Sequence, residues 1–228
     1  MTEQSTSSET VFIYKIMSLL IVIICFGLAV WAYPHLPDKV PSHWNISGEI
    51  NRYSGRLSGA FLLPSIMLLT LAFRYVVPLI DPKKSNYKLM GKAYWGSIFG
   101  VIFFLGVFYF GKIIFSLGMV PFDIVPSIVQ VGLGMLLMVI GNYLPKLKHN
   151  YLFGIRTPWT LANEEVWYKT HRFMGPVNFI VGIIIVFVGL VANFWSRSAL
   201  PIVVSLVLIL PVCSLVYSYV SFRKLAKV

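Results

Sequence analysis

Long apolar runs, separated by short polar segments, are the dominant pattern of this sequence. Six runs have the length of about 20 mostly apolar residues that an α-helix needs to cross the hydrocarbon core of a bilayer. They cover residues 11–33, 58–79, 94–118, 123–144, 176–195 and 199–221. Only the short stretches VPFD and SRSA join the third run to the fourth and the fifth to the sixth, which predicts two tight helical hairpins. The pattern therefore predicts an all-α integral membrane protein, a bundle of six transmembrane helices.

The composition agrees with a membrane protein. Hydrophobic residues make up 57% of the 228-residue chain and charged residues only 12%, whereas soluble domains carry roughly 25% charged residues. A net charge of +11 would suggest nucleic-acid binding in a soluble chain, but in a membrane protein it marks cytoplasmic loops. Direct binding of nucleic acid is therefore not expected. Cys25 and Cys213 both lie inside apolar runs, where neither a disulfide nor a metal pair is expected.

The distribution of basic residues predicts which side of the membrane each polar segment faces. With six spans, segments 80–93 and 145–175 lie on the same side as both termini, and together these parts hold twelve Lys and Arg residues. The other side holds four. Because basic residues concentrate in cytoplasmic loops, we expect the polar N-terminus (1–10), the polar cassette (145–175) and the basic tail (222–228) in the cytoplasm. Segment 34–57 is expected to face outward.

Segment 34–57 has the composition of a stiff, extended loop. Three prolines near its start prevent regular helix there, and the Asn, Ser and Gly residues that follow are typical of turns. The loop also carries imidazoles and carboxylates, which zinc accepts as ligands, on His35, Asp38, His43 and Glu49. Their spacing matches no zinc signature. A solvated loop at the membrane interface, or one that recognises a molecule outside the cell, is therefore favoured over a metal site.

The polar cassette contains an irregular stretch, GIRTPWT, followed by a predicted short amphipathic helix over 163–174. Asn163 suits the N-cap of this helix. Gly175 and Pro176 are typical of the end of one helix and the first turn of the next. The expected apolar face holds Val166, Trp167, Thr170, Phe173 and Met174, and the opposite, solvated face holds Glu164, Tyr168, His171 and Arg172. We expect this helix to lie along the cytoplasmic surface.

Acid–base chemistry is the one catalytic interpretation that the cassette permits. Glu164 and His171 are two helical turns apart, and a carboxylate–histidine pair can transfer protons. The cassette has no serine or cysteine nucleophile, no HExxH pair and no glycine-rich phosphate loop. A solvated, self-paired polar face is therefore favoured, and neither an enzyme activity nor a cofactor is expected.

Ionisable and polar residues inside the spans are interpreted as structural. Lys15 and Arg74 lie near the cytoplasmic ends of their spans, from which their side chains can reach water. Lys112 and Gln130 flank the VPFD turn. A hydrogen bond across that hairpin, or one from Lys112 to Asp123, would satisfy polar groups that are costly in lipid.

Residues 141–175, GNYLPKLKHNYLFGIRTPWTLANEEVWYKTHRFMG, resemble the signature segment of the SdpI family of bacterial membrane proteins. The run GIRTPWTL, followed by a glutamate-bearing VW and by THR, carries this resemblance. The outward stretch LPDKVPSHWNISGEINRY, with its P-x-H-W-N-x-x-G core, is similar to the short domain of unknown function that often precedes that signature.

The resemblance implies a multi-pass protein of the bacterial plasma membrane that gives immunity to a secreted peptide toxin. For signalling members of the family it also implies capture of a transcriptional autorepressor at the cytoplasmic face. The implied partners are membrane lipid, the toxin and that autorepressor. In the outward loop the matching positions are His43, Trp44, Asn45 and Gly48. In and beside the cassette they are Asn142, Pro145, Asn150, Gly154, Arg156, Thr157, Pro158, Trp159, Thr160, Glu165, Trp167, His171 and Arg172.

The resemblance also suggests a division of the chain into two regions. The first, 11–93, holds two spans and the outward loop, and the second, 94–221, is an SdpI-like region of four helices. A transporter or exporter of peptides or small molecules is the alternative function, but the sequence shows neither the internal repeat nor the polar path typical of one. A membrane enzyme is the third alternative.

Overall fold

The computed structural model describes residues 2–45, 49–121, 124–191 and 199–226. Its long helices are α1 (Thr2–Ala32), α2 (Arg56–Ile80), α4 (Gly91–Ser116), α5 (Ile124–Tyr143), α7 (Glu164–Val191) and α8 (Ala199–Leu225). The shorter elements are β1 (Lys39–Trp44), β2 (Ile50–Gly55), α3 (Lys84–Leu89), the 3-10 turn η1 (Leu144–Lys146) and α6 (Pro158–Ala162). Six of the helices are long and apolar enough to cross a membrane. The prediction of an all-α membrane bundle with six spans is therefore confirmed.

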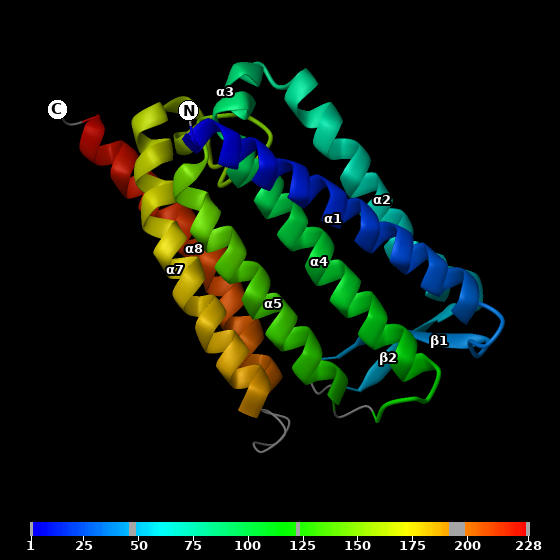
Figure 1. Cartoon of the computed structure of the whole chain (residues 1–228). Helices are drawn as coiled ribbons and strands as arrows, with labels where there is room; N and C mark the ends of the chain where they lie inside the picture. Colours follow the sequence, from blue (N-terminus) through cyan, green and yellow to red (C-terminus); the bar gives the residue numbers. More distant parts are fainter. Residues whose placement is uncertain (1, 46–48, 122–123, 192–198, 227–228) are drawn as a thin grey trace.

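The two ends of the bundle carry different structures (Figure 1). Both chain termini and α3 lie at one end, which we call the terminal end. The hairpin of β1 and β2 lies at the other, the hairpin end. An even number of spans returns the chain to the side on which it started, so this placement follows directly from six crossings.

The helices pack as two groups that meet along one seam. In the first group α1 contacts α2 and α4, and α2 contacts α4; in the second α7 contacts α5 and α8. The second group has its own buried apolar core, whereas the core of the first group also takes in Tyr143, Leu147 and Trp167. The seam is the contact between α4 and α5. The suggested division at residues 93 and 94 stays a prediction.

Paired glycines bring the backbones of α5 and α7 into direct contact. A Cβ on Gly134 would lie 2.6 Å from the carbonyl oxygen of Gly182, and one on Gly141 would lie 2.6 Å from that of Gly175. The glycines are seven residues apart on each helix, so both pairs lie on the same antiparallel interface. In lipid, helices associate by close packing of small residues, because the apolar solvent supplies no hydrophobic driving force between them.

Segment 34–57, which is predicted to face outward, folds as a β-hairpin, whereas the sequence predicted an extended loop. β1 pairs antiparallel with β2, with irregular register around His43. The prolines that exclude helix here do not exclude a strand with an unpaired edge, which explains the difference. Val40 is fully buried. It packs so closely against Gly59 that a Cβ on this glycine would lie 2.8 Å from the Val40 side chain. This contact fixes the hairpin on the start of α2.

The prediction of a separate surface helix over 163–174 is wrong, because α7 runs without a break from Glu164 to Val191. Gly175 serves helix packing here, since a Cβ on it would lie 2.5 Å from the Cγ of Pro145. Pro176 is tolerated inside the helix at the cost of one backbone hydrogen bond. The predicted helix is therefore the first part of the fifth span.

The two predicted faces of this segment are only partly correct. Val166, Trp167, Thr170 and Met174 are buried as expected, but Phe173 is 43% exposed. His171, expected on the solvated face, is fully buried. His171 is buried because a loop from another part of the cassette covers that face of the helix.

Two polar side chains of the spans, those of Lys112 and Gln130, are buried inside the helix bundle. Lys112 is buried and its Nζ donates to the carbonyl oxygen of Gly59, 3.1 Å away on α2. Lys112 thus has a structural role, as predicted, but its partner on α2 was not predicted. Asp123, one of the partners expected for it, lies outside the described residues. Gln130 is also buried, where α7 approaches it at Gly189.

Substitution of Gly182 by Ala should destabilise the bundle by about 1–3 kcal/mol, the usual cost of overpacking. The new Cβ would lie 2.6 Å from the carbonyl oxygen of Gly134. Because this oxygen belongs to the backbone, it cannot move away by a change of side-chain rotamer. The measurement is the thermal unfolding midpoint of the purified protein in detergent. Gly27→Ala on α1 is the matched control, because nothing lies within 4 Å of its Cβ position. Equal midpoints for the two variants would contradict the proposed packing.

Candidate functional site

The loop of residues 147–157 lies at the terminal end and is held there by a buried carboxylate. Asp81 directly follows α2 and is buried. Its Oδ2 accepts hydrogen bonds from the backbone N–H groups of Tyr151 (2.9 Å) and Leu152 (3.1 Å). Its Oδ1 accepts one from the backbone N–H of Lys83, at 2.8 Å. Because buried backbone donors without partners are costly, Asp81 makes it possible for this irregular loop to pack against the helices.

Asn150 completes the support of the same loop from inside. It is fully buried, and its Oδ1 accepts from the backbone N–H groups of Leu152 (3.1 Å) and Phe153 (2.7 Å). The hydroxyl of Tyr87 on α3 lies 2.9 Å from Asp81 Oδ2 and 3.1 Å from Asn150 Oδ1. Burial, and then the hydrogen bond to Asp81, raise the pKa of Tyr87 well above its usual range. Tyr87 therefore remains a donor that links α3 to the loop.

A lysine and a histidine form a second link between the first helix group and the cassette. Lys83 Nζ bonds to Nδ1 of His149 and lies 3.7 Å from Oε2 of Glu164. The amide of Asn86 donates to the carbonyl oxygen of His149, at 2.7 Å. Burial and the adjacent Lys83 charge lower the pKa of His149. The imidazole is thus neutral and accepts the ammonium proton at Nδ1.

His171 uses both ring nitrogens to hold the loop. Its Nε2 accepts from the backbone N–H of Ile155 (3.0 Å), and its Nδ1 donates to the carbonyl oxygen of Trp167 (2.8 Å). The ring stacks on that of Trp167 at a centroid distance of 4.0 Å. With both nitrogens engaged, His171 has none left for a substrate. Glu164, its expected partner, bonds to the hydroxyl of Tyr168 (3.2 Å) and pairs with Lys83.

Gly154 is required by the same contact. Its φ of 117° lies in the region that side-chain-bearing residues rarely adopt. A Cβ on Gly154 would also lie 2.7 Å from Nε2 of His171. The glycine in GIRTPWTL therefore lets the loop approach the histidine closely.

The threonines of GIRTPWTL cap α6 and attach it to α8. Thr157 and Thr160 form a capping box, and Pro158 occupies the first turn. The hydroxyl of Thr157 also donates to Ser218 Oγ on α8, at 2.9 Å. The ring of Trp159 packs on that of Tyr219, with centroids 5.0 Å apart. This part of the motif joins the cassette to the last helix.

Six of the predicted cassette residues are exposed. Two of them are Gly154 and Pro158, and the four with polar or charged side chains are Asn142, Arg156, Glu165 and Arg172. Asn142 accepts from Lys146 Nζ at 3.3 Å, and Arg156 donates to the carbonyl oxygen of Tyr151 at 3.4 Å. Glu165 pairs with Lys169 at 2.7 Å, as expected from their spacing. These polar and charged side chains contribute little to the packing, so they form the part of the cassette that is open to its surroundings.

The motif of segment 34–57 lies on the hairpin, where His43 is exposed and Asn45 is half-buried. His43 bonds through Nδ1 to Asn51 Oδ1 (2.7 Å), and the side chain of Asn45 bonds to Glu49 in two ways, at 2.8 and 3.1 Å. Trp44 is half-buried, and Gly48 lies outside the described residues.

The candidate zinc ligands of the outward segment are each bound elsewhere. His35 bonds to the carbonyl oxygen of Trp31, and Asp38 pairs with Arg56 at 2.8 Å. No group of three or more His, Cys, Asp or Glu side chains in the described residues is placed to hold a metal ion. The geometry thus gives the metal interpretation no support.

Several residues of the terminal network were missed by sequence reasoning, notably Asp81, Tyr87 and Asn86. The available signal was the position of Asp81, one of only eight acidic residues, directly after an apolar run. A lone carboxylate at the end of a span needs donors, and here they come from a loop about 70 residues away in the chain.

Substitution of Asp81 by Asn should destabilise the fold by at least about 2 kcal/mol, because an amide N–H₂ would replace an acceptor that faces backbone donors. The measurement is the unfolding midpoint in detergent, together with protease cleavage of the loop 147–157. Asp38→Asn is the control, since its side chain is 93% exposed and its ion pair should contribute less than about 1 kcal/mol. A loop that stays as protected in the Asp81 variant as in the control variant would refute this role.

Comparison with known proteins assigns both motifs to described families. Residues 146–218 match the SdpI/YfhL protein family, and residues 20–68 match a domain of unknown function, DUF1648. The chain is also 29% identical over 212 residues to the immunity protein SdpI of Bacillus subtilis (strain 168), covering 92% of this chain and 97% of that protein. No solved structure matches it. The region that matches the SdpI/YfhL family model runs from η1 through the cassette into α8.

Proposed function

We propose that this chain is a membrane immunity protein that protects its cell from a secreted peptide toxin. The observation that carries the proposal is the likeness to the immunity protein SdpI, which extends over nearly the full length of both chains. A shared segment alone would support only a shared fold element. Alignment from the first span to the last supports a shared task, and the proposed task is binding rather than catalysis.

The proposed placement is the bacterial plasma membrane, with the terminal end in the cytoplasm and the hairpin outside. Twelve Lys and Arg residues of the polar segments fall on the side of the termini and four on the side of the hairpin, which is the bias of cytoplasmic loops. A toxin that approaches from outside would then meet the hairpin first. The exposed side chains of His43 and Tyr53 are among those it would contact.

At the cytoplasmic face, the proposed partner is a transcriptional autorepressor. The surface residues Arg156 and Arg172 are the candidates for contact, since neither has an ion-pair partner in the described part of the chain. Toxin binding at the hairpin would change how the cassette presents them. The two helix groups meet at one seam and at the Asp81 network, which gives such a signal a physical route.

The immunity proposal predicts that expression of this chain raises the survival of sensitive bacteria challenged with a sporulation-delay type peptide toxin. His43→Ala should reduce that protection by about tenfold in toxin dose, the effect of losing one contact of roughly 1.4 kcal/mol. His35→Ala is the matched control, because it removes another exposed histidine at the hairpin end. Membrane insertion of all three proteins is verified by cell fractionation.

Failure of the wild-type chain to protect, despite correct insertion, would contradict the immunity proposal. Protection that disappears when the membrane potential is collapsed would instead favour an exporter. Equal protection by the His43 and His35 variants would remove His43 from the toxin contact.

The signalling proposal predicts that the double variant Arg156→Ala/Arg172→Ala protects cells but no longer induces transcription of its own gene after toxin exposure. Both side chains are exposed, so the fold should be unaffected. The transcript is measured by quantitative PCR in the native host. Arg223→Ala/Lys224→Ala removes the same charge from the exposed end of α8 and should leave induction intact. Normal induction in the first variant would exclude these arginines as the docking residues.

A further inference from the structure

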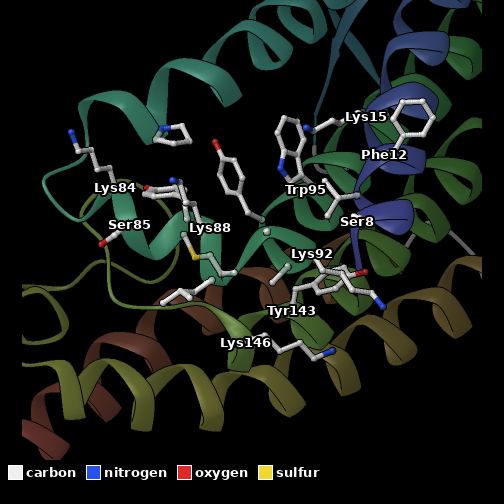
Figure 2. A pocket seen from close by; sticks show the side chains of 18 of the residues that line it. Ser8, Phe12, Lys15, Lys84, Ser85, Lys88, Lys92, Trp95, Tyr143 and Lys146 are labelled. Carbon is white, nitrogen blue, oxygen red and sulfur yellow. The ribbon is translucent and has the colours of Figure 1, made fainter. Parts of the chain in front are cut away.

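A large groove opens at the terminal end, among the ends of α1, α2, α3 and α4 (Figure 2). Its volume is about 1250 Å³. In Figure 2, α1 contributes side chains from one wall and α3 from the other, and Lys15 reaches toward Trp95. The basic residues that line the groove are Lys15, Lys84, Lys88, Lys92 and Lys146. None of the described residues in its lining is acidic.

The charge of these lysines is not balanced within the described structure. Its ion pairs join Arg56 to Asp38, Lys83 to Glu164 and Lys169 to Glu165, and none uses a groove lysine. Lys15 lies over the ring of Trp95 at 4.5 Å, and Lys146 lies over that of Tyr143 at 5.2 Å. Glu9 is exposed on α1 but does not line the groove. Five lysines around one hollow repel each other unless an anion lies between them.

Arg74 adds an independent observation beside the groove. The sequence predicts that this side chain reaches water, but it is only 5% exposed. Its guanidinium lies 4.7 Å from the ring centre of Trp95, which lines the groove, and donates to the hydroxyl of Tyr75 at 3.2 Å. Its Nε and Nη1 are buried without a hydrogen-bond partner. The guanidinium also lies 4.8 Å from the ring centre of Tyr75. A buried cation is normally paired, so the free Nε and Nη1 are donors that could bind an anionic group.

The groove lies at the level where lipid headgroups meet the protein. The apolar span of α1 begins at Ser8, that of α2 ends at Ile80 and that of α4 begins at Gly91. Beside the lysines, the lining residues Phe12 and Leu79 are 64% and 75% exposed. An anionic group held next to exposed apolar side chains at the interface is the chemistry of a phospholipid.

We propose that this groove binds an anionic phospholipid. Its phosphate and headgroup lie among Lys84, Lys88 and Lys92, and its acyl chains run along Phe12 and Leu79 into the bilayer. Basic pockets at the ends of transmembrane helices select anionic headgroups by charge, and apolar contact with the chains adds affinity that a free phosphate lacks. The site is independent of the proposed immunity function, because it lies at the opposite end from the hairpin.

The test compares phosphatidylglycerol with phosphatidylcholine, added to the full-length protein in neutral detergent. Native mass spectrometry measures the lipid retained, and the unfolding midpoint measures stabilisation. We expect the wild type to retain phosphatidylglycerol at least about tenfold better than phosphatidylcholine, with the preference falling as salt is raised. Equal retention of the two lipids, or a preference unaffected by salt, would overturn the proposal.

Variants then locate the site. K84Q/K88Q/K92Q should remove most of the preference, whereas K148Q/R223Q/K224Q, with the same charge removed at the same end but outside the groove, should keep it. An equal loss in both variants would mean general surface charge and no site. Equal stabilisation by glycerol phosphate would show that acyl chains are not recognised. Stabilisation by an acidic peptide but not by phosphatidylglycerol would make the groove a peptide-docking site, and the lipid proposal would be wrong.

Discussion

The carboxylate of Asp81 is the interaction on which the terminal end depends. A bundle of apolar helices can pack an irregular loop against its end only if the backbone donors of that loop find acceptors. Asp81 supplies two of these acceptor contacts from the first helix group to a loop of the second. Since the groups otherwise meet mainly along α4 and α5, this small network fixes their relation at one end. The glycine contacts between α5 and α7 then set how closely the second group packs.

The spans could be predicted from the sequence because their signal is local. An uninterrupted apolar run of sufficient length has only one stable conformation in lipid, and all six appear as helices. The predicted helix end inside the cassette was wrong for a physical reason. By local sequence rules, Gly175 and Pro176 are typical of a helix boundary. In the structure, Gly175 instead leaves room for the close approach of Pro145 and Gly141. Local preference cannot distinguish a glycine that ends a helix from one that admits a neighbour.

The sequence could predict which segment forms the candidate site, but not how the side chains of that segment contact one another and the rest of the bundle. The sequence placed the cassette and its resemblance, and Asn163 does cap α7 by accepting from the backbone N–H of Val166 at 3.0 Å. It could not show that His171 turns inward, because the stripe pattern describes one helix and not what covers it. Nor could it join Asp81 to Tyr151, since no spacing rule relates residues 70 positions apart. Long-range hydrogen bonds of this kind become visible only when the helices are placed.

Six of the thirteen cassette positions that match the family signature are explained by the fold itself. Asn150, Gly154, Thr157, Thr160, Trp167 and His171 are occupied in capping, stacking or holding the loop. A sequence can match the signature by keeping this architecture, whatever molecule it binds. Under the proposed function, ligand identity depends on residues that the fold leaves free, which are the exposed positions of the hairpin and the arginines of the cassette surface. Under the proposed immunity function, two relatives with the same signature and different hairpins should therefore share a structure and differ in the toxin they recognise.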